Sequence, residues 1–134
     1  MNKTGLYLGA CNSISNTFWL KEFFHMGEHP HINKKEGSLA GRKAFKNFCY
    51  LLSKDSDIFD LLHELLLKEE FVLWKQATEL NNGLSIMDMS QPQKLLRKKF
   101  KKDFSSFFTN FKSFEKKFKA NLPLPTDIKK TSLI

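Results

Sequence analysis

Apolar residues recur at helical spacing through the last third of the chain. Successive members of one apolar series lie 4, 4, 3, 4, 3 and 4 positions apart, close to the repeat of an α-helix. The spacing predicts one helix over residues 94–119 with an apolar stripe that Phe108 widens by one position. The series consists of Leu96, Phe100, Phe104, Phe107, Phe111, Phe114 and Phe118. We expect its phenylalanines to lie in the core.

Lysines fall largely outside this stripe. Cationic and aromatic side chains therefore segregate to opposite faces of the predicted helix, whereas surfaces that stack nucleic-acid bases carry both on one face. The segregation favours a core helix with a solvated cationic outer face, and an amphipathic membrane-surface helix stays the alternative. The candidate surface for an anionic partner comprises Lys98, Lys101, Lys102, Lys112, Lys116 and Lys119.

The N-terminal part of the chain predicts two further helices. The first is expected over residues 15–26, with Ser15 or Asn16 as its N-cap and Gly27 as its stop. The second is expected over residues 38–52. Its apolar face is predicted to comprise Leu39, Phe45, Phe48, Cys49 and Leu52.

A leucine-rich helical region follows, with Asp55 or Asp57 at its start. Its apolar positions follow the i, i+3, i+4, i+7, i+8 pattern of a helix that faces a core. They are Ile58, Leu61, Leu62, Leu65 and Leu66. The helix either runs on or restarts at Lys68, and it is expected to stop after Leu80. A loop then leads to Ser90, which is predicted to be the next N-cap, with a proline in the first turn.

These elements predict an all-α fold, a single bundle of about five helices with a Phe-rich interior. The chain has 134 residues, 14 of them Phe, and 41% of its residues are hydrophobic, which is typical of one globular domain. We expect the bundle over residues 1–120 and a C-terminal tail over residues 121–134, which contains two prolines.

The net charge of +8 is concentrated at one end of the chain. Residues 1–93 carry ten Lys and Arg against eleven Asp and Glu, whereas residues 94–134 carry twelve against three. Any electrostatic interaction with a partner is therefore expected to involve the last third of the chain.

The sequence predicts an intracellular, cytoplasmic protein without a transmembrane segment. The longest apolar run, residues 61–67, is interrupted by His63 and Glu64 and is far shorter than the ~20 residues of a membrane-spanning helix. No secretory signal is evident at the N-terminus. Cys11 and Cys49 show no spacing that suggests a disulfide framework.

Candidate catalytic and metal-binding residues are few. His25, His29 and His31 have spacings that zinc sites use, but no second ligand pair accompanies them, so loop histidines are the favoured interpretation. His63 and Glu64 could be combined with Cys49, yet no motif places them around a nucleophile. Phosphate-binding glycine motifs are absent from the sequence. We expect no enzymatic activity, no cofactor and no structural metal.

The last four residues, Thr-Ser-Leu-Ile, match the pattern Ser/Thr-x-aliphatic-carboxylate. Such an end can add as a strand to a PDZ domain, which would hold the terminal carboxylate. Ser132 and Ile134 are the candidate residues for this peptide ligand.

Residues 41–52, GRKAFKNFCYLL, resemble the G-x-x-x-F-x-x-F-L opening of an RGS (regulator of G-protein signalling) domain. Gly41, Phe45 and Phe48 match, and Cys49 stands where Leu is usual. The family's acidic stretch and Phe-Trp pair have three alternative matches. Without a gap, Asp55, Asp57, Ile58 and Leu61 stand there, with Leu61 in place of the tryptophan; EEFVLW at 69–74 is similar after an insertion of about a dozen residues; and SISNTFWLKEFF at 13–24, ahead of the glycine, is a partial match. The resemblance covers at most residues 38–80.

The resemblance implies an all-helical bundle whose loops grip a G-protein α-subunit. The Asn-containing loop motifs that make this grip in the family are not matched. The leading hypothesis from the sequence is therefore a non-enzymatic helical protein–protein interaction module, related to G-protein signalling through that resemblance. The alternative is a basic protein that binds nucleic acid or an anionic membrane surface through residues 94–119.

Overall fold

The computed structural model describes residues 3–24 and 42–130. These residues form five α-helices, which are α1 (Lys3–Phe23), α2 (Arg42–Lys54), α3 (Ile58–Leu80), α4 (Ser90–Asp103) and α5 (Phe111–Ala120). Two short 3-10 helices, η1 (Ile86–Met89) and η2 (Pro125–Asp127), complete the described elements, which include no strand. The predicted all-α bundle of about five helices is confirmed.

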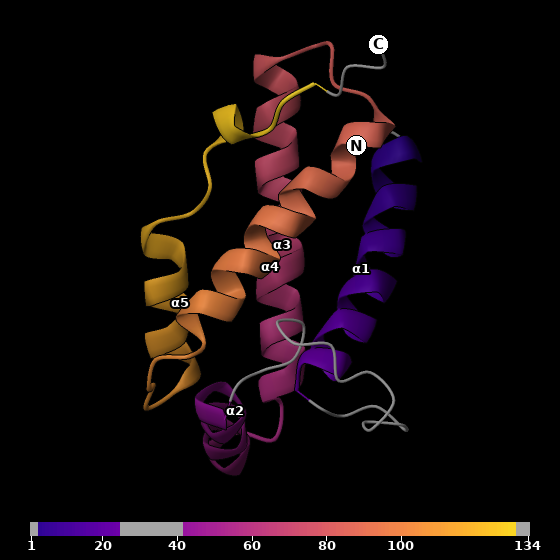
Figure 1. The fold of residues 1–134 in the computed structure, drawn as a ribbon. Coiled ribbons are helices and arrows are strands. Elements are labelled where there is room, and N and C mark those ends of the chain that lie inside the picture. The colour runs from indigo at the N-terminus through magenta and orange to yellow at the C-terminus, as the bar shows by residue number, and fades with distance from the viewer. Residues whose placement is uncertain (1–2, 25–41, 131–134) are drawn as a thin grey trace.

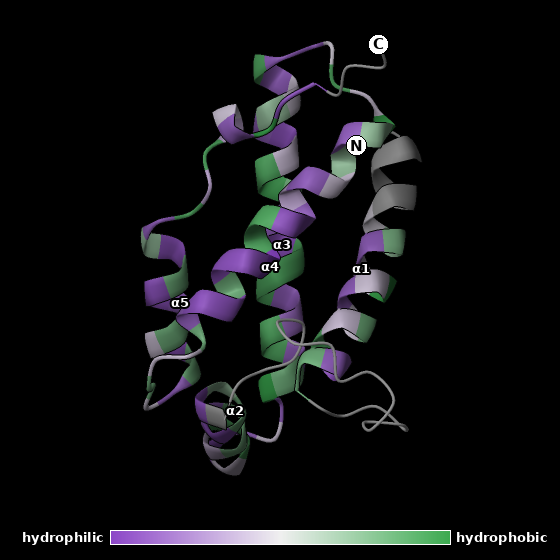
Figure 2. Ribbon diagram, viewed as in Figure 1, coloured by the Kyte–Doolittle hydropathy of each residue, from purple (hydrophilic) through white to green (hydrophobic). Residues whose placement is uncertain are grey.

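Helix α3 is the longest element and runs along the length of the bundle (Figure 1). Helices α1 and α4 both pack against it, and α4 crosses in front of it at an angle in the view shown. Helix α5 packs on α4, while α2 lies across the end where α3 begins. Every helix therefore shares a surface with either α3 or α4. Hydrophobic and hydrophilic residues are interspersed along each helix, as expected for helices with one buried side (Figure 2).

The core combines leucines, mostly from α3, with a cluster of phenylalanine rings drawn from four helices and the segment after α4. Phe24, at the end of α1, stacks on Phe48 of α2 with ring centroids 4.0 Å apart. Phe100 of α4 meets Phe114 of α5 edge to face at 5.2 Å. Such stacked and edge-to-face pairs are the favoured arrangements of aromatic rings. The predicted Phe-rich interior is confirmed.

The single helix predicted over residues 94–119 is wrong. Helix α4 ends at Asp103, and α5 begins at Phe111, where the side chain of Asn110 caps it by accepting a 2.8 Å hydrogen bond from the backbone N–H of Ser113. The intervening segment is rich in Ser, Thr and Asn, which favour caps and turns over helix interiors. The break lets α5 turn back, so that its phenylalanines meet those of α4.

The break also removes one ring from the predicted core. The side chain of Phe107 is 67% exposed, and its ring lies beside that of Tyr50, with centroids 5.4 Å apart. Phe108, the residue after Phe107, is buried, and Phe111 is half-buried. The prediction that Phe104 and Phe114 lie in the core is confirmed.

Helix α2 faces the core with a different set of side chains from those predicted. Phe48 is buried as expected, but its neighbours in the core are Ala44 and Leu51. Phe45 and Leu52 are largely exposed, and Cys49 is exposed. An error of one position in the apolar face moves each side chain by about 100° around a helix.

Helix boundaries differ at both ends of the bundle. Helix α1 begins at Lys3, so Ser15 and Asn16 lie in its interior, and neither is the N-cap that the sequence predicted. Ser90 is the first residue of α4 and not its N-cap, which is Met89 and makes no side-chain capping hydrogen bond. Ser85 instead caps η1, where its side chain accepts a hydrogen bond from the backbone N–H of Met87. Helix α3 is continuous through Lys68.

The described part of the predicted tail packs on the bundle. Ile128 is buried in the core, and the backbone N–H of Lys129 donates a 2.9 Å hydrogen bond to the side chain of Gln91. Residues 121–130 therefore return along the bundle toward the start of α4. Among the described residues, no helix is long and apolar enough to cross a membrane.

Candidate functional site

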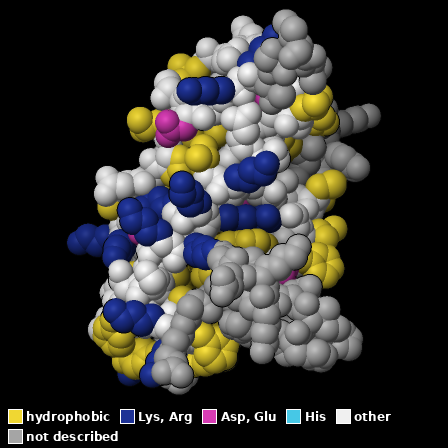
Figure 3. Space-filling model, viewed as in Figure 1, with side chains coloured by type: hydrophobic (Ala, Val, Ile, Leu, Met, Phe, Trp, Pro, Cys, Tyr) yellow, Lys and Arg dark blue, Asp and Glu magenta, His cyan; other side chains and the backbone are white. Residues whose placement is uncertain are grey.

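The outer sides of α4 and α5 carry a dense group of lysines. Figure 3 shows a band of Lys and Arg side chains across the face of the molecule on which these helices lie. Of the predicted surface, Lys101 is half-buried and the other five lysines are exposed. The structure adds the exposed Lys94 and Lys117 to this surface, which we call the cationic face.

Few carboxylates neutralise the cationic face. Lys119 lies 3.7 Å from Glu115, and Lys99 pairs with the buried Asp103 at 2.7 Å. No hydrogen bond or ion pair within the described part of the chain engages the ammonium groups of the other lysines on α4 or of Lys112 and Lys116. The face thus presents mostly uncompensated positive charge, which attracts anionic surfaces over about a Debye length.

Arg97 does not belong to the cationic face. Its guanidinium turns inward from α4, lies 5.4 Å from the ring of Trp19, and donates hydrogen bonds to Ser15 (2.8 Å) and Asn16 (2.9 Å) of α1. The amide of Asn16 in turn donates a 2.9 Å hydrogen bond to Glu70 Oε2 on α3. These residues form a polar chain, Arg97–Asn16–Glu70, that joins three helices through the middle of the bundle.

The polar chain leaves two buried atoms without partners. Glu70 is only 1% exposed, and its second carboxylate oxygen, Oε1, accepts no hydrogen bond; Nε of Arg97 donates none. A buried polar atom without a partner usually marks a bound water or ligand, or a strained site. Glu70 is therefore a candidate ligand-binding residue.

Burial raises the pKa of the Glu70 carboxyl to about 7, although the hydrogen bond from Asn16 and the charge of Arg97 both act to lower it. Burial also lowers the pKa of the Arg97 guanidinium, and the charge of Glu70 opposes that change. The carboxyl of Glu70 thus changes its charge near neutral pH, which is a property common at functional sites.

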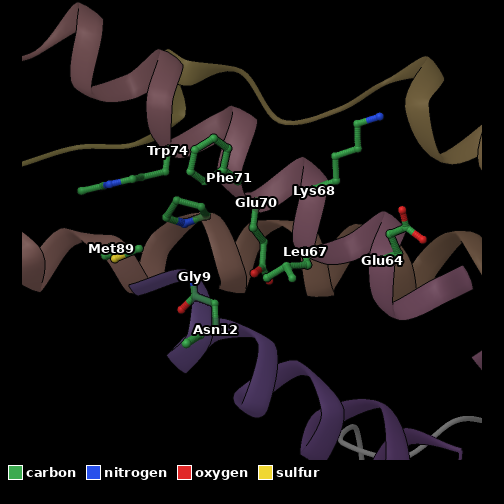
Figure 4. A pocket seen from close by; sticks show the side chains of 11 residues that line it. Gly9, Asn12, Glu64, Leu67, Lys68, Glu70, Phe71, Trp74 and Met89 are labelled. Carbon is green, nitrogen blue, oxygen red and sulfur yellow. The ribbon is translucent and has the colours of Figure 1, made fainter. Parts of the chain in front are cut away.

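A cavity of about 510 Å³ opens beside Glu70, between α1, α3 and the start of α4. Figure 4 shows the Glu70 side chain extending from α3 toward Gly9 and Asn12 of α1, which line the opposite wall. The rest of the wall is mostly apolar. It includes Ala10, Leu67, Phe71, Trp74, Met89 and Pro92.

His63, a candidate from the sequence, has a structural contact. Its Nε2 lies 2.9 Å from the backbone oxygen of Ser13 and 3.4 Å from that residue's hydroxyl, which joins α3 to α1. Cys49 is exposed on α2. The described residues contain no group of three or more His, Cys, Asp or Glu side chains that could hold a metal ion. The predicted absence of catalysis and of metal stays a prediction.

Several predicted residues lie outside the described part of the chain. They are the histidines His25, His29 and His31, the C-terminal residues Ser132 and Ile134, Gly27 as the stop of the first predicted helix, Leu39 on the apolar face of the second, and Gly41 of the RGS-like motif. The loop interpretation of the histidines and the PDZ-ligand interpretation of the C-terminus stay predictions.

Sequence reasoning missed Asn16, Glu70 and Arg97. A weak signal was present, because Glu70 lies eight positions after Leu62 and four after Leu66, on the same buried side of α3. A buried acidic residue needs a polar partner. The residues that surround Glu70 in this way, Asn16 and Arg97, lie on other helices. Only the packing of the helices reveals the partners.

No family model matches the chain, and no curated protein or solved structure matches it either. The resemblance to RGS domains therefore rests on the residues quoted above.

Proposed function

We propose that the protein is a non-catalytic helical module that binds an acidic surface of a partner protein through the cationic face. The observation that carries this proposal is the row of uncompensated lysines on the outer sides of α4 and α5. Complementary charge steers association and raises its rate at low salt. Because the two helices are fixed by a shared phenylalanine core, they present these lysines on a rigid support.

The chemistry of the face favours a protein partner over nucleic acid. Arg is the residue that recognises both phosphate groups and guanine bases by donating two parallel hydrogen bonds. The only Arg of α4 and α5, Arg97, is committed to the interior. The rings that could stack on bases are mostly buried, since Phe100, Phe104 and Phe114 are fully enclosed.

An anionic membrane surface is the second candidate, because of Phe107. This ring is 67% exposed in the segment between α4 and α5, where it follows Lys101 and Lys102 and precedes Lys112. An exposed aromatic ring flanked by lysines can insert among lipid headgroups while the lysines attract the anionic surface.

Charge reversal tests the proposal. The variant Lys98→Glu/Lys101→Glu/Lys102→Glu is compared with Lys21→Glu/Lys43→Glu/Lys75→Glu, which makes the same change of net charge at exposed lysines of α1, α2 and α3. Proteins captured by the immobilised chain at about 0.15 M salt are identified, and crosslinks from the lysines of the cationic face are mapped. A purified G-protein α-subunit, the partner that the RGS resemblance implies, is tested in parallel.

We expect a captured protein to be retained by the parent and by the control variant but lost from the face variant. Its crosslinks should fall in a segment rich in Asp and Glu. Retention that nuclease abolishes would identify a nucleic-acid partner instead. Co-sedimentation with phosphatidylserine vesicles that is lost in Phe107→Ala would support the membrane candidate. Equal capture by both triple variants would contradict a role of the cationic face.

A further inference from the structure

We propose that the cavity between α1, α3 and the start of α4 binds a small apolar amine, whose ammonium group is held by Glu70 and whose hydrocarbon body lies against Trp74, Phe71 and Leu67. This site is separate from the cationic face, and its existence does not depend on the function proposed for that face.

The shape of the cavity fits a small molecule. Its volume of about 510 Å³ lies within the range of natural ligand pockets, which are mostly apolar and contain a few placed polar groups. Here the apolar walls come from α3 on one side and from Met89 and Pro92 on the other. A hydrocarbon body would displace water from these apolar walls, and removing apolar surface from water favours binding.

The charge within the cavity selects a cation. Oε1 of Glu70 has no hydrogen-bond donor, although the residue is 1% exposed and its other oxygen is bonded to Asn16. Glu64 and Lys68, which carry opposite charges, also line the cavity, and both charged ends extend away from Glu70 (Figure 4). An ammonium group donates three hydrogen bonds and would supply the donor that Oε1 lacks.

The aromatic walls favour the same ligand. Trp74 and Phe71 both line the cavity on the side of α3 from which Glu70 extends. Their rings offer apolar surface against which the hydrocarbon body packs. A carboxylate ligand would instead meet the charge of Glu70, and a neutral alcohol would supply a weaker donor. The cavity therefore discriminates by charge as well as by shape.

Three probes of equal length test the proposal, namely n-octylamine, n-octanol and octanoate. Binding is measured by isothermal calorimetry and by amide chemical shifts at pH 8, above the pKa of about 7 of Glu70. We expect saturable one-to-one binding of octylamine, at least tenfold tighter than octanol, with shifts at residues 9–12 and 67–74. Octanoate should not bind.

Two variants separate the roles of shape and charge. Gly9 lines the cavity, and a Cβ built on it meets no atom within 4 Å, so Gly9→Leu should fold and fill the space. We expect Gly9→Leu to weaken octylamine binding at least tenfold. Glu70→Gln should bind octanol as the parent does and lose the preference for the amine. Glu79→Gln, at an exposed position of α3, is the matched control.

Three results would overturn the proposal. Octylamine that does not saturate would show that the cavity holds water only. Equal affinities for all three probes would show that Glu70 does not select the ligand. Unchanged binding in Gly9→Leu, with shifts outside residues 9–12 and 67–74, would place the amine elsewhere on the surface.

Discussion

The side-chain amide of Asn16 on α1 donates a 2.9 Å hydrogen bond to the carboxylate of Glu70 on α3, 54 residues later in the chain. The same amide accepts a hydrogen bond from Arg97 of α4. One neutral side chain thus lies between an acid and a base that do not touch each other directly. Because hydrogen bonds to charged groups contribute more than neutral ones, this contact helps to hold the three helices together beside the cavity.

Stability should depend on pH through Glu70. Its pKa rises from the ordinary value of 4.5 to about 7 on folding, so between these values the folded protein binds a proton that the unfolded chain has lost. The contribution is fully present below pH 4.5 and is lost as the pH rises to 7. At about 1.4 kcal/mol per pH unit, the loss is about 3 kcal/mol.

Urea denaturation of the parent and of Glu70→Gln at pH 4.5, 6 and 8 measures this effect. The difference in unfolding free energy between the two proteins should shift by about 3 kcal/mol in favour of the variant from pH 4.5 to pH 8. Other groups titrate equally in both proteins. A difference that does not change with pH would show that Glu70 has an ordinary pKa.

Removing the bridging amide should be costly. Asn16→Ala deprives Glu70 of its donor and Arg97 of one acceptor, both in the interior. We expect a loss of about 2–3 kcal/mol, the range for buried hydrogen bonds to charged groups. Denaturant unfolding checks this, with Asn82→Ala at an exposed turn as the control. Equal stability of the two variants would mean that water replaces the amide.

The exposed and buried phenylalanines should respond differently to truncation. Phe104→Ala removes a fully enclosed ring and should cost about 3–5 kcal/mol through lost transfer energy and a cavity. Phe107→Ala removes a ring that is 67% exposed and should change stability by less than about 1 kcal/mol. Melting curves of both variants measure this contrast. Similar losses would indicate that Phe107 packs into the core.

The break between α4 and α5 depends on a cap. Asn110→Ala removes the side chain that accepts the hydrogen bond from Ser113 and should destabilise the protein by about 1 kcal/mol. Asn110→Asp should retain most of the stability, because aspartate caps equally well. Chemical denaturation compares the three proteins. If Asn110→Asp loses as much as Asn110→Ala, the side chain acts in some other way.

The sequence by itself determined the all-α class and most of the buried surface. Helix α3 is the clearest case, since Ile58, Leu62 and Leu65 repeat at the spacing of one helical face and are all buried. The same holds for Phe100 and Phe104 within α4. Such patterns are local, because residues three and four positions apart share a helix face whatever the helix packs against.

Periodicity alone could not locate the break at residues 104–110. The series of spacings stays helical across it, and the rings of Phe104 and Phe114 pack together, with centroids 5.0 Å apart, only because the chain turns between them. The sequence signal for the break was Asn110, because a capping residue favours the start of a new helix, whereas the apolar spacing favours one continuous helix. Burial of α5 against α4 decided that competition, since it encloses Phe114 and Phe118.

The candidate binding site was decided by tertiary structure. Glu70 occupies a position on α3 that periodicity assigns to the core, and its charge changes near neutral pH because the packed helices exclude water from it. Its partner Asn16 lies on α1, and Arg97 lies on α4. Distances between helices depend on how they pack, which no local spacing encodes, so this polar chain and its cavity arise only in the folded protein.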